Sequence, residues 1–171
     1  MVYNPNIPTE ECFISPHRLT AEGIVYSTRP FSYQSQIIDD FYIRFHEGKV
    51  VETHARVGDE LLKSMVSMDE GASYLGECAL VPQKSPICES GLLFYNTLYD
   101  ENAACHLALG FGFPDTIEDY HHKSLEECRA LGVNDSMIHE DVMIGCDTMD
   151  IDATCADGSV VPIFRSGNWA F

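Results

Sequence analysis

The sequence predicts an α+β fold, a strand-rich domain with a mixed or antiparallel sheet and a few short helices. Segments that resemble strands outnumber those with helical periodicity, and turn-forming residues separate them. The chain has 171 residues, of which 45% are hydrophobic and 22% charged, and this is enough to form one hydrophobic core. No repeat, low-complexity tract or linker divides it. We therefore expect a single domain over residues 1–171.

The first predicted strands lie in the N-terminal third of the chain. Residues 23–28 (GIVYST) form one strand, and residues 41–57 form a hairpin. The hairpin strands are 41–45 and 49–57, joined by a turn at Glu47-Gly48. The alternation of apolar and polar residues is imperfect here, so the sequence does not define the register.

Helical periodicity begins at about Asp59, where two acids occupy the first turn and apolar residues follow at helical spacing. A second short helix is expected to end at Gly76. Residues 124–132 (SLEECRALG) predict a further helix that stops at Gly132.

The remaining segments favour strands. They are 77–82 (ECALVP), 91–99 (GLLFYNTLY) and 138–145 (IHEDVMIG). The C-terminal segment, 149–167, predicts a hairpin that turns at 156–158, Ala-Asp-Gly.

The charge balance restricts the possible partners. The chain has 27 Asp and Glu against 10 Lys and Arg, a formal net charge of -17. Such a field repels nucleic-acid phosphates and anionic lipid, so we expect neither as a partner. The chain has no apolar run long enough to span a membrane, and its N-terminus lacks the layout of a signal peptide. We therefore expect a soluble, cytoplasmic protein.

The seven cysteines are scattered and form no CxxC pair. This spacing argues against a disulfide framework and a zinc ribbon, and favours reduced, mostly buried thiols. Cys78 and Cys105 stand next to candidate functional residues, but adjacent residues of a strand point to opposite faces.

The familiar short catalytic motifs are absent, and isolated polar residues in apolar surroundings remain. His139 and Asp141 alternate on a predicted strand and so share one face, where they form a plausible half-site for a divalent metal. A structural His-Asp pair is the alternative. Glu77 and His106 stand among apolar residues, where each is either a ligand or the partner of an ordinary core hydrogen bond.

Several motifs taken together resemble a known family. In order, they are NIPTEECF, YSTRP, DEGASYLGECALVP, SPI, FYNTLYDENAACHLALG, GVNDSMIHEDVMIG, DG and GNW. They closely resemble the C-terminal part of the thermophilic-type metallo-aminopeptidases, the family of aminopeptidase T and aminopeptidase S. The resemblance covers essentially all 171 residues.

The resemblance implies a site with two divalent metal ions that removes N-terminal residues from peptides. The positions that match the family's metal ligands are Glu11, Glu77, His106, His139 and Asp141. Zinc or cobalt would suit these ligands, and magnesium or manganese is compatible. Three carboxylates and two imidazoles can hold two ions only if one carboxylate bridges them, and Glu77 is the expected bridge. The resemblance also implies a homodimer.

Glu10 is the candidate general base that takes a proton from the attacking water. Because adjacent residues of an extended chain point apart, Glu10 can face the site differently from the ligand Glu11. An exposed acid or a hydrogen-bond acceptor behind the ligands is the alternative. Arg29, Asn96 and Asp100 belong to the family-like motifs and are expected to support the ligands or face the substrate, although turn chemistry also selects Asn and Asp.

Two features depart from the family. A tyrosine that the family has close to the metals corresponds here to Phe113, which is expected beside the ligands or facing the substrate but can neither ligate a cation nor donate a hydrogen bond from its ring. Family members also have an additional N-terminal lobe, so we expect this chain to correspond to one part of such a protein. The sequence therefore predicts a metallo-aminopeptidase domain, or alternatively a metal-binding fragment or interaction module that is inactive without that lobe. The other five histidines are expected at the surface: His17, His46, His54, His121 and His122.

Overall fold

The computed structural model describes residues 10–171 and confirms a strand-rich α+β fold. The strands are β1 (Cys12–Ile14), β2 (Gly23–Tyr26), β3 (Phe31–Tyr33), β4 (Gln36–His46), β5 (Lys49–Val57), β6 (Leu75–Leu80), β7 (His106–Gly110), β8 (His139–Met143), β9 (Ile151–Thr154), β10 (Val160–Arg165) and β11 (Asn168–Trp169). The α-helices are α1 (Asp59–Val66), α2 (Pro86–Ser90), α3 (Thr97–Asp100) and α4 (Leu125–Ala130). Short 3₁₀ turns are Gly71–Ser73, Glu101–Ala103, Pro114–Thr116 and Tyr120–His122.

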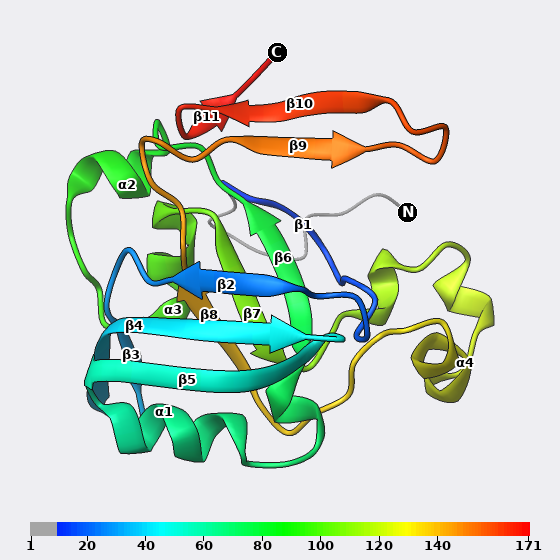
Figure 1. Cartoon of the computed structure of the whole chain (residues 1–171), viewed down its shortest axis with the longest axis horizontal. Helices are drawn as coiled ribbons and strands as arrows, with labels where there is room; N and C mark the ends of the chain where they lie inside the picture. Colours follow the sequence, from blue (N-terminus) through cyan, green and yellow to red (C-terminus); the bar gives the residue numbers. More distant parts are fainter. Residues whose placement is uncertain (1–9) are drawn as a thin grey trace.

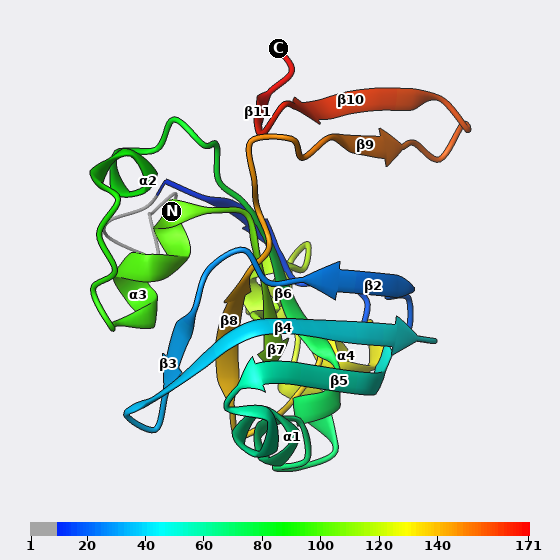
Figure 2. The same ribbon diagram turned by 60° about the vertical axis from the view of Figure 1, so that its left-hand side comes forward.

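The strands form three antiparallel groups. One sheet has the order β1-β6-β7-β8, and a second has the order β2-β4-β3 with β5 also paired to β4. The third is the ribbon β11-β10-β9, which lies along one edge of the molecule (Figure 1). The turned view shows the ribbon at one end and α1 at the other, with β4 and β5 between them (Figure 2). None of the helices among residues 10–171 has the length and apolar composition of a membrane span.

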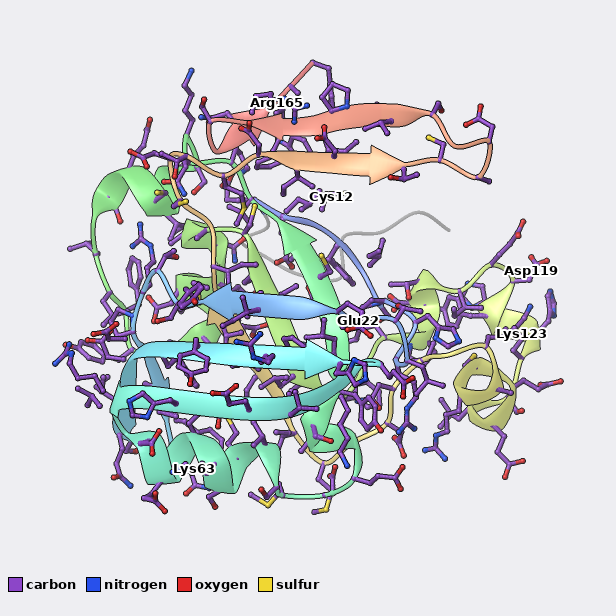
Figure 3. The ribbon with its side chains drawn as sticks, in the orientation of Figure 1. Cys12, Glu22, Lys63, Asp119, Lys123 and Arg165 are labelled. Carbon is purple, nitrogen blue, oxygen red and sulfur yellow. The ribbon has the colours of Figure 1, made fainter. Side chains whose placement is uncertain are left out.

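The hydrophobic core lies between the first two sheets. Buried residues of β3 and β4, including Phe31 and Ile43, form one cluster with Leu107 and Leu109 of β7 and Val142 of β8. Helix α1 closes this core through Leu62 and Met65, while Lys63 points outward, as Figure 3 shows. One face of the sheet β1-β6-β7-β8 is therefore anchored in the core, which leaves its other face for a site.

Several predicted elements are confirmed. The hairpin turns at Glu47-Gly48, where both residues have positive φ, as a tight turn of this kind requires. Helix α4 begins with a capping box between Ser124 and Glu127, and Gly132 follows it with φ 102°. The C-terminal hairpin turns where expected, with Gly158 N–H donating to the Cys155 carbonyl.

Two predicted elements are wrong. Residues 91–99 do not form a strand, because the Asp100 carboxylate accepts the N–H groups of Phe94 and Asn96 and curls the chain into α3. The short helix expected to end at Gly76 is a 3₁₀ turn that ends at Ser73, since β6 already begins at Leu75. Helical and apolar patterns over so few residues predict neither the side-chain capture of backbone N–H groups by Asp100 nor the residue at which β6 begins.

All seven cysteines are free, but the prediction that most are buried is wrong. Only Cys105 and Cys128 are buried, while Cys12 and Cys155 are exposed. Cys78 packs against the core cluster, on the face opposite Glu77, as predicted.

Asp69 ties α1 to the segment that leads into β8. Its carboxylate accepts hydrogen bonds from the N–H groups of Ala72 (2.8 Å) and Met137 (2.6 Å) and from the Ser136 hydroxyl. The N–H of Met137, the largest contribution, holds the pKa of Asp69 below its usual value of 3.8.

We expect Asp69→Ala to lower the free energy of unfolding by about 2 to 3 kcal/mol at neutral pH, because several charge-assisted hydrogen bonds are lost together. The folded-state pKa lies below the unfolded one, so this contribution is present above pH 3.8 and is lost as the pH falls toward the lowered value. Urea denaturation over a pH series measures both effects. Glu60→Gln, at an exposed acid of α1, is the matched control, and an equal loss in both variants would contradict the role of Asp69.

Candidate metal centre

Strand register brings the predicted ligands onto one face of the sheet β1-β6-β7-β8. Ala108 of β7 is paired with Glu77 on one side and Asp141 on the other, so both carboxylates flank a small side chain. His106 lies two residues before Ala108, on the same face. Phe13 of β1 pairs with Ala79, which places it on this face as well. Glu11 precedes Phe13 by two residues and follows the same alternation.

A β-bulge directs Glu77 into this face. The pairing of β6 with β7 shifts between Leu75 and Glu77, with Gly76 between them. A Cβ at Gly76 would lie 2.1 Å from the Phe111 carbonyl oxygen. That carbonyl accepts a hydrogen bond from His139 Nδ1 at 2.7 Å. The glycine therefore permits a close approach that orients both Glu77 and His139.

The predicted ligands converge in a buried cluster. His106 Nε2 lies 3.1 Å from Glu11 Oε2 and 3.9 Å from Glu77 Oε1. His139 Nε2 lies 3.2 Å from Glu77 Oε2 and 3.6 Å from Asp141 Oδ1. The side chains of Glu11, Glu77, His106 and Asp141 are at most 5% exposed, and that of His139 is 25% exposed.

Backbone carbonyls orient both imidazoles. His106 Nδ1 lies 3.0 Å from the Ala104 carbonyl oxygen, and His139 Nδ1 has the same relation to the Phe111 carbonyl. A carbonyl can only accept, so each Nδ1 donates and each Nε2 faces the carboxylates. This is the arrangement in which a histidine presents a lone pair to a metal ion.

Glu101 joins the cluster, although sequence reasoning assigned it no ligand role. It is 7% exposed and forms a hydrogen bond with Asp141. One carboxylate oxygen from each of Glu101 and Asp141 and one ring nitrogen of His106 lie within 4.8 Å of one another. The available signal was its position five residues before His106, at the start of the 3₁₀ turn that leads into β7.

Crowding of these groups raises their pKa values. Burial raises the pKa of Glu77, and the hydrogen bond with His139, which lowers it, is the smaller effect. Burial, followed by the charge of Asp141, raises the pKa of Glu101 to about 9. Burial lowers the pKa of His106 and His139, but hydrogen bonds to Glu11 and Glu77 and the charge of Asp141 outweigh it and bring both to about 9. In the absence of cations, bound protons thus balance the carboxylates.

The cluster fits divalent cations. Three overlapping groups have ligand atoms within 4.8 Å of one another: Glu11 with Glu77 and His106, Glu77 with His139 and Asp141, and Glu101 with His106 and Asp141. Asp141 Oδ1 is buried and makes no hydrogen bond within residues 10–171. It lies 3.6 and 3.9 Å from the two Nε2 atoms, separations that two ligands of one ion also have.

A pocket opens onto the cluster. It has a volume of about 240 Å³ and is lined by Glu11, Phe13, Glu77, Leu98, Glu101, Phe113, Asp115 and His139. The Phe113 ring packs 4.8 Å from the His139 ring and 5.6 Å from Phe13, and Ser15 Oγ accepts its backbone N–H. Phe113 therefore lies beside the ligands, and its ring supports His139 by packing alone.

Glu10 lies at the edge of the cluster rather than among the lining residues. It is half-buried, and its N–H donates to Asn102 Oδ1 at 2.8 Å. Asn102 is fully buried and also donates to the Leu98 carbonyl. These two hydrogen bonds of Asn102 connect the Glu10-Glu11 pair to α3 and so position Glu11.

The other predicted supporting residues lie elsewhere. Arg29 donates to Cys88 Sγ of α2, Asn96 is exposed at the start of α3, and Asp100 holds the 94–96 backbone. None of the three lines the pocket among the described residues. The five remaining histidines are all exposed, as predicted.

We expect Glu101→Gln to change the pH dependence of stability when a chelator removes cations. The folded-state pKa of about 9 exceeds the usual 4.5, so wild-type stability falls as the pH rises between these values. Glutamine imitates the protonated acid and cannot lose a proton. The variant should therefore lose less stability, by up to about 1.4 kcal/mol per pH unit for one proton. Chemical denaturation from pH 5 to 9 measures this difference.

When a divalent cation is added, Glu101→Gln should instead be less stable than the wild type, because the variant lacks one carboxylate ligand. Glu126→Gln, at an exposed acid of α4, controls for the loss of charge alone. Parallel pH profiles for wild type and Glu101→Gln would contradict the assignment of Glu101 to the cluster.

Comparison with known proteins finds relatives over almost the whole chain. Aminopeptidase 2 of Geobacillus stearothermophilus is 52% identical over 169 residues, which are 99% of this chain and 41% of that protein. Aminopeptidase AmpS of Bacillus subtilis (strain 168) is 49% identical over 166 residues, or 97% of this chain and 40% of that protein. The chain thus spans about 40% of the length of these relatives.

The fold is similar to that of a solved structure, wild-type AmpT from Thermus thermophilus. The TM-score is 0.90 with 42% sequence identity, covering 98% of this chain and 41% of that one. Residues 1–169 match the profile of the family described as thermophilic metalloprotease (M29). The resemblance inferred from the motifs is confirmed, and the chain belongs to the M29 family of thermophilic metalloproteases.

Proposed function

We propose that this chain is the metal-binding domain of a di-metal aminopeptidase that hydrolyses N-terminal residues from peptides. The observation that carries the proposal is the buried cluster of four carboxylates and two imidazoles at the base of a pocket. Membership of a metalloprotease family supports it, as do relatives named aminopeptidases.

The charge of the cluster supports two cations. Glu11, Glu77, Glu101 and Asp141 together have four negative charges when ionised, which two divalent ions would balance. Glu77 belongs to two of the three ligand groups, which suits the proposed bridging role. Zinc and cobalt suit mixed imidazole and carboxylate ligands, and magnesium or manganese would be favoured by the carboxylates.

Bound cations would supply an activated water and polarise the scissile carbonyl. The chain's own residues would do the rest. Glu10 would accept the proton of the water and return it to the leaving amine. Phe13, Leu98 and Phe113 form an apolar wall that would hold the N-terminal residue of the peptide and exclude bulk water. The substrate's α-amine would be bound within the anionic cluster.

A metal-binding module without catalytic activity is the second candidate. It is favoured by the span of the chain, about 40% of each relative, because regions outside this span can complete the substrate cavity. The Phe113 ring also offers the pocket no hydrogen-bond donor where the family resemblance has a tyrosine.

The partners that we propose are peptides with a free N-terminus. The net charge of -17 supports the exclusion of nucleic acid and anionic membrane surfaces, and a cytoplasmic location is compatible with seven free cysteines.

We expect the purified chain to bind close to two equivalents of zinc or cobalt and to hydrolyse aminoacyl chromogenic substrates. Glu77→Gln should reduce both binding and turnover, because it removes a charge shared by two ligand groups. Elemental analysis after gel filtration and a colorimetric assay measure the two quantities. Metal without turnover would favour the second candidate, and failure to retain either metal would exclude both.

Glu10→Gln should lower kcat by about 10² to 10⁴-fold while leaving the bound-metal content unchanged, since Glu10 is proposed as a base and not as a ligand. Steady-state kinetics and elemental analysis of the same preparation test this separation. Glu118→Gln is the control for an acid outside the cluster. If kcat is preserved, or if metal content falls with it, Glu10 is not the base.

A further inference from the structure

A second pocket adjoins the one that opens onto the cluster. It has a volume of about 480 Å³ and is lined by residues 113–115 and by Tyr120, His121, Lys123, Leu125 and Cys128. We call it the outer pocket. Phe113 and Asp115 line both pockets, so the two are contiguous, with these residues at the junction.

The pocket at the cluster is small for a peptide. Its volume of about 240 Å³ lies below the range of roughly 300 to 1,000 Å³ that is typical of ligand sites. A peptide whose first residue occupies it must therefore extend beyond it. The outer pocket is the adjoining space, and its volume lies within that range.

The segment between β7 and α4 that forms the outer pocket is held in a defined conformation. Ser15 Oγ accepts the Phe113 N–H at 2.7 Å, which ties the junction to the end of β1. The Thr116 hydroxyl donates to the Phe113 carbonyl at 2.7 Å, and the Lys123 N–H donates to the Tyr120 carbonyl at 2.9 Å. Figure 3 labels Lys123 in this segment, close to α4. These hydrogen bonds form the outer pocket before any ligand is bound.

The outer pocket combines apolar groups with one lysine. Cys128 is buried and Leu125 is exposed, so apolar atoms lie both inside the pocket and at its edge. The Tyr120 and His121 rings pack 4.0 Å apart. Lys123 is the only Lys or Arg among the described lining residues. Apolar walls with a single charged group are typical of a site that binds and orients an organic ligand.

The Lys123 ammonium is not neutralised within residues 10–171. Six of the ten Lys and Arg residues form ion pairs with Asp or Glu: Arg18, Arg44, Arg56, Lys63, Arg129 and Arg165. In the described chain, Lys123 Nζ donates instead to the Glu118 backbone carbonyl, at 2.8 Å. The Glu127 carboxylate accepts the Ser124 N–H and hydroxyl of the capping box. An ammonium has three donors, so Lys123 can still bind an anion.

The pocket between Arg18 and Arg129 is a weaker candidate for an anion. Arg18 pairs with Glu70 at 3.2 Å, and Arg129 pairs with Asp135 at 2.7 Å. Both guanidinium groups are therefore already neutralised. Among the described residues, this pocket also shares no lining residue with the pocket at the cluster.

We propose that the outer pocket binds the C-terminal part of short peptides and that Lys123 selects them by pairing with the C-terminal carboxylate. The inference rests on the proposed function, which places the N-terminal residue at the cluster. The net charge of -17 repels a peptide carboxylate over most of the surface, and Lys123 reverses this locally. Asp115, at the junction, would accept a backbone N–H of the peptide. Peptides that end within the outer pocket are then favoured over longer or amidated ones.

Binding of peptides that cannot lose an N-terminal residue tests the proposal without relying on activity. The probes are N-acetyl-Leu-Ala, its C-terminal amide, and N-acetyl-Leu-Asp-amide, whose only carboxylate is on a side chain. NMR titration of the ¹⁵N-labelled chain with a chelator should shift the amide signals of Lys123 and Tyr120. The free acid should bind about 5- to 10-fold more tightly than its amide, as expected for a half-exposed charge pair.

Equal affinity of the free acid and its amide, or no binding of either, would overturn the proposal. Tighter binding of the aspartyl amide than of the free acid would also overturn it, because the outer pocket would then recognise an acidic side chain and not the C-terminus.

Lys123→Gln should remove the preference for the free acid, whereas Lys123→Arg should keep it, because arginine retains the charge. Glutamine can still donate to the Glu118 carbonyl, so the comparison separates the loss of charge from a disturbed loop. The matched control is Lys49→Gln, at an exposed lysine of β5 that lines a different pocket. Retention of the preference in Lys123→Gln, or its loss in the control, would contradict the role of Lys123.

Steady-state kinetics with added cation separates this inference from the proposed function. Lys123→Gln should lower the ratio of kcat/KM for Leu-Ala to that for Leu-Ala-amide by about 5-fold. If no substrate is hydrolysed, the proposed function fails, and the binding titrations still decide this inference. Turnover with equal kcat/KM for the two wild-type substrates would overturn this inference and leave the proposed function intact.

Discussion

The burial of four carboxylates in one small volume is the constraint on which the rest of the site depends. Glu11, Glu77, Glu101 and Asp141 come from four separate segments and meet two imidazoles on one sheet face. Several ionised acids cannot share a site of low dielectric without compensating positive charge. In the protein alone, protons on Glu101 and the histidines supply it, as their pKa values of about 9 indicate. Divalent cations are the alternative source.

The surrounding structure prevents this cluster from relaxing apart. One face of the sheet is fixed in the hydrophobic core through Leu107, Leu109 and Val142, so the opposite face is rigid. Carbonyls of Ala104 and Phe111 fix the imidazoles, and Asn102 fixes the entry of the chain at Glu10. These are backbone interactions, which hold the electrostatically unfavourable arrangement without adding further charge.

Charge is unevenly distributed along the chain: the net charge is -17, yet residues 90–99 contain no Asp, Glu, Lys or Arg. A net charge of -17 favours solubility and discourages non-specific association. The Asp100 carboxylate accepts the N–H groups of Phe94 and Asn96 within this uncharged segment. The acid at position 100 thus shapes this segment, while its neighbour Glu101 enters the cluster.

The sequence by itself determined the elements that depend on local chemistry. The turn at Glu47-Gly48, the helix from Asp59, the capped α4 and the hairpin at 156–158 all follow from residues close to one another in the chain. The alternation of His139 and Asp141 was predictable for the same reason, and family motifs located Glu11, Glu77 and His106. Only the tertiary structure decided the bulge at Gly76, the loop at 91–96 and the place of Glu101 in the cluster. The bulge and the place of Glu101 depend on partners distant along the chain, namely the Phe111 carbonyl and Asp141, and no local pattern encodes which distant groups will meet. The loop at 91–96 depends on the nearby Asp100 carboxylate, which captures backbone N–H groups that an apolar pattern alone assigns to a strand.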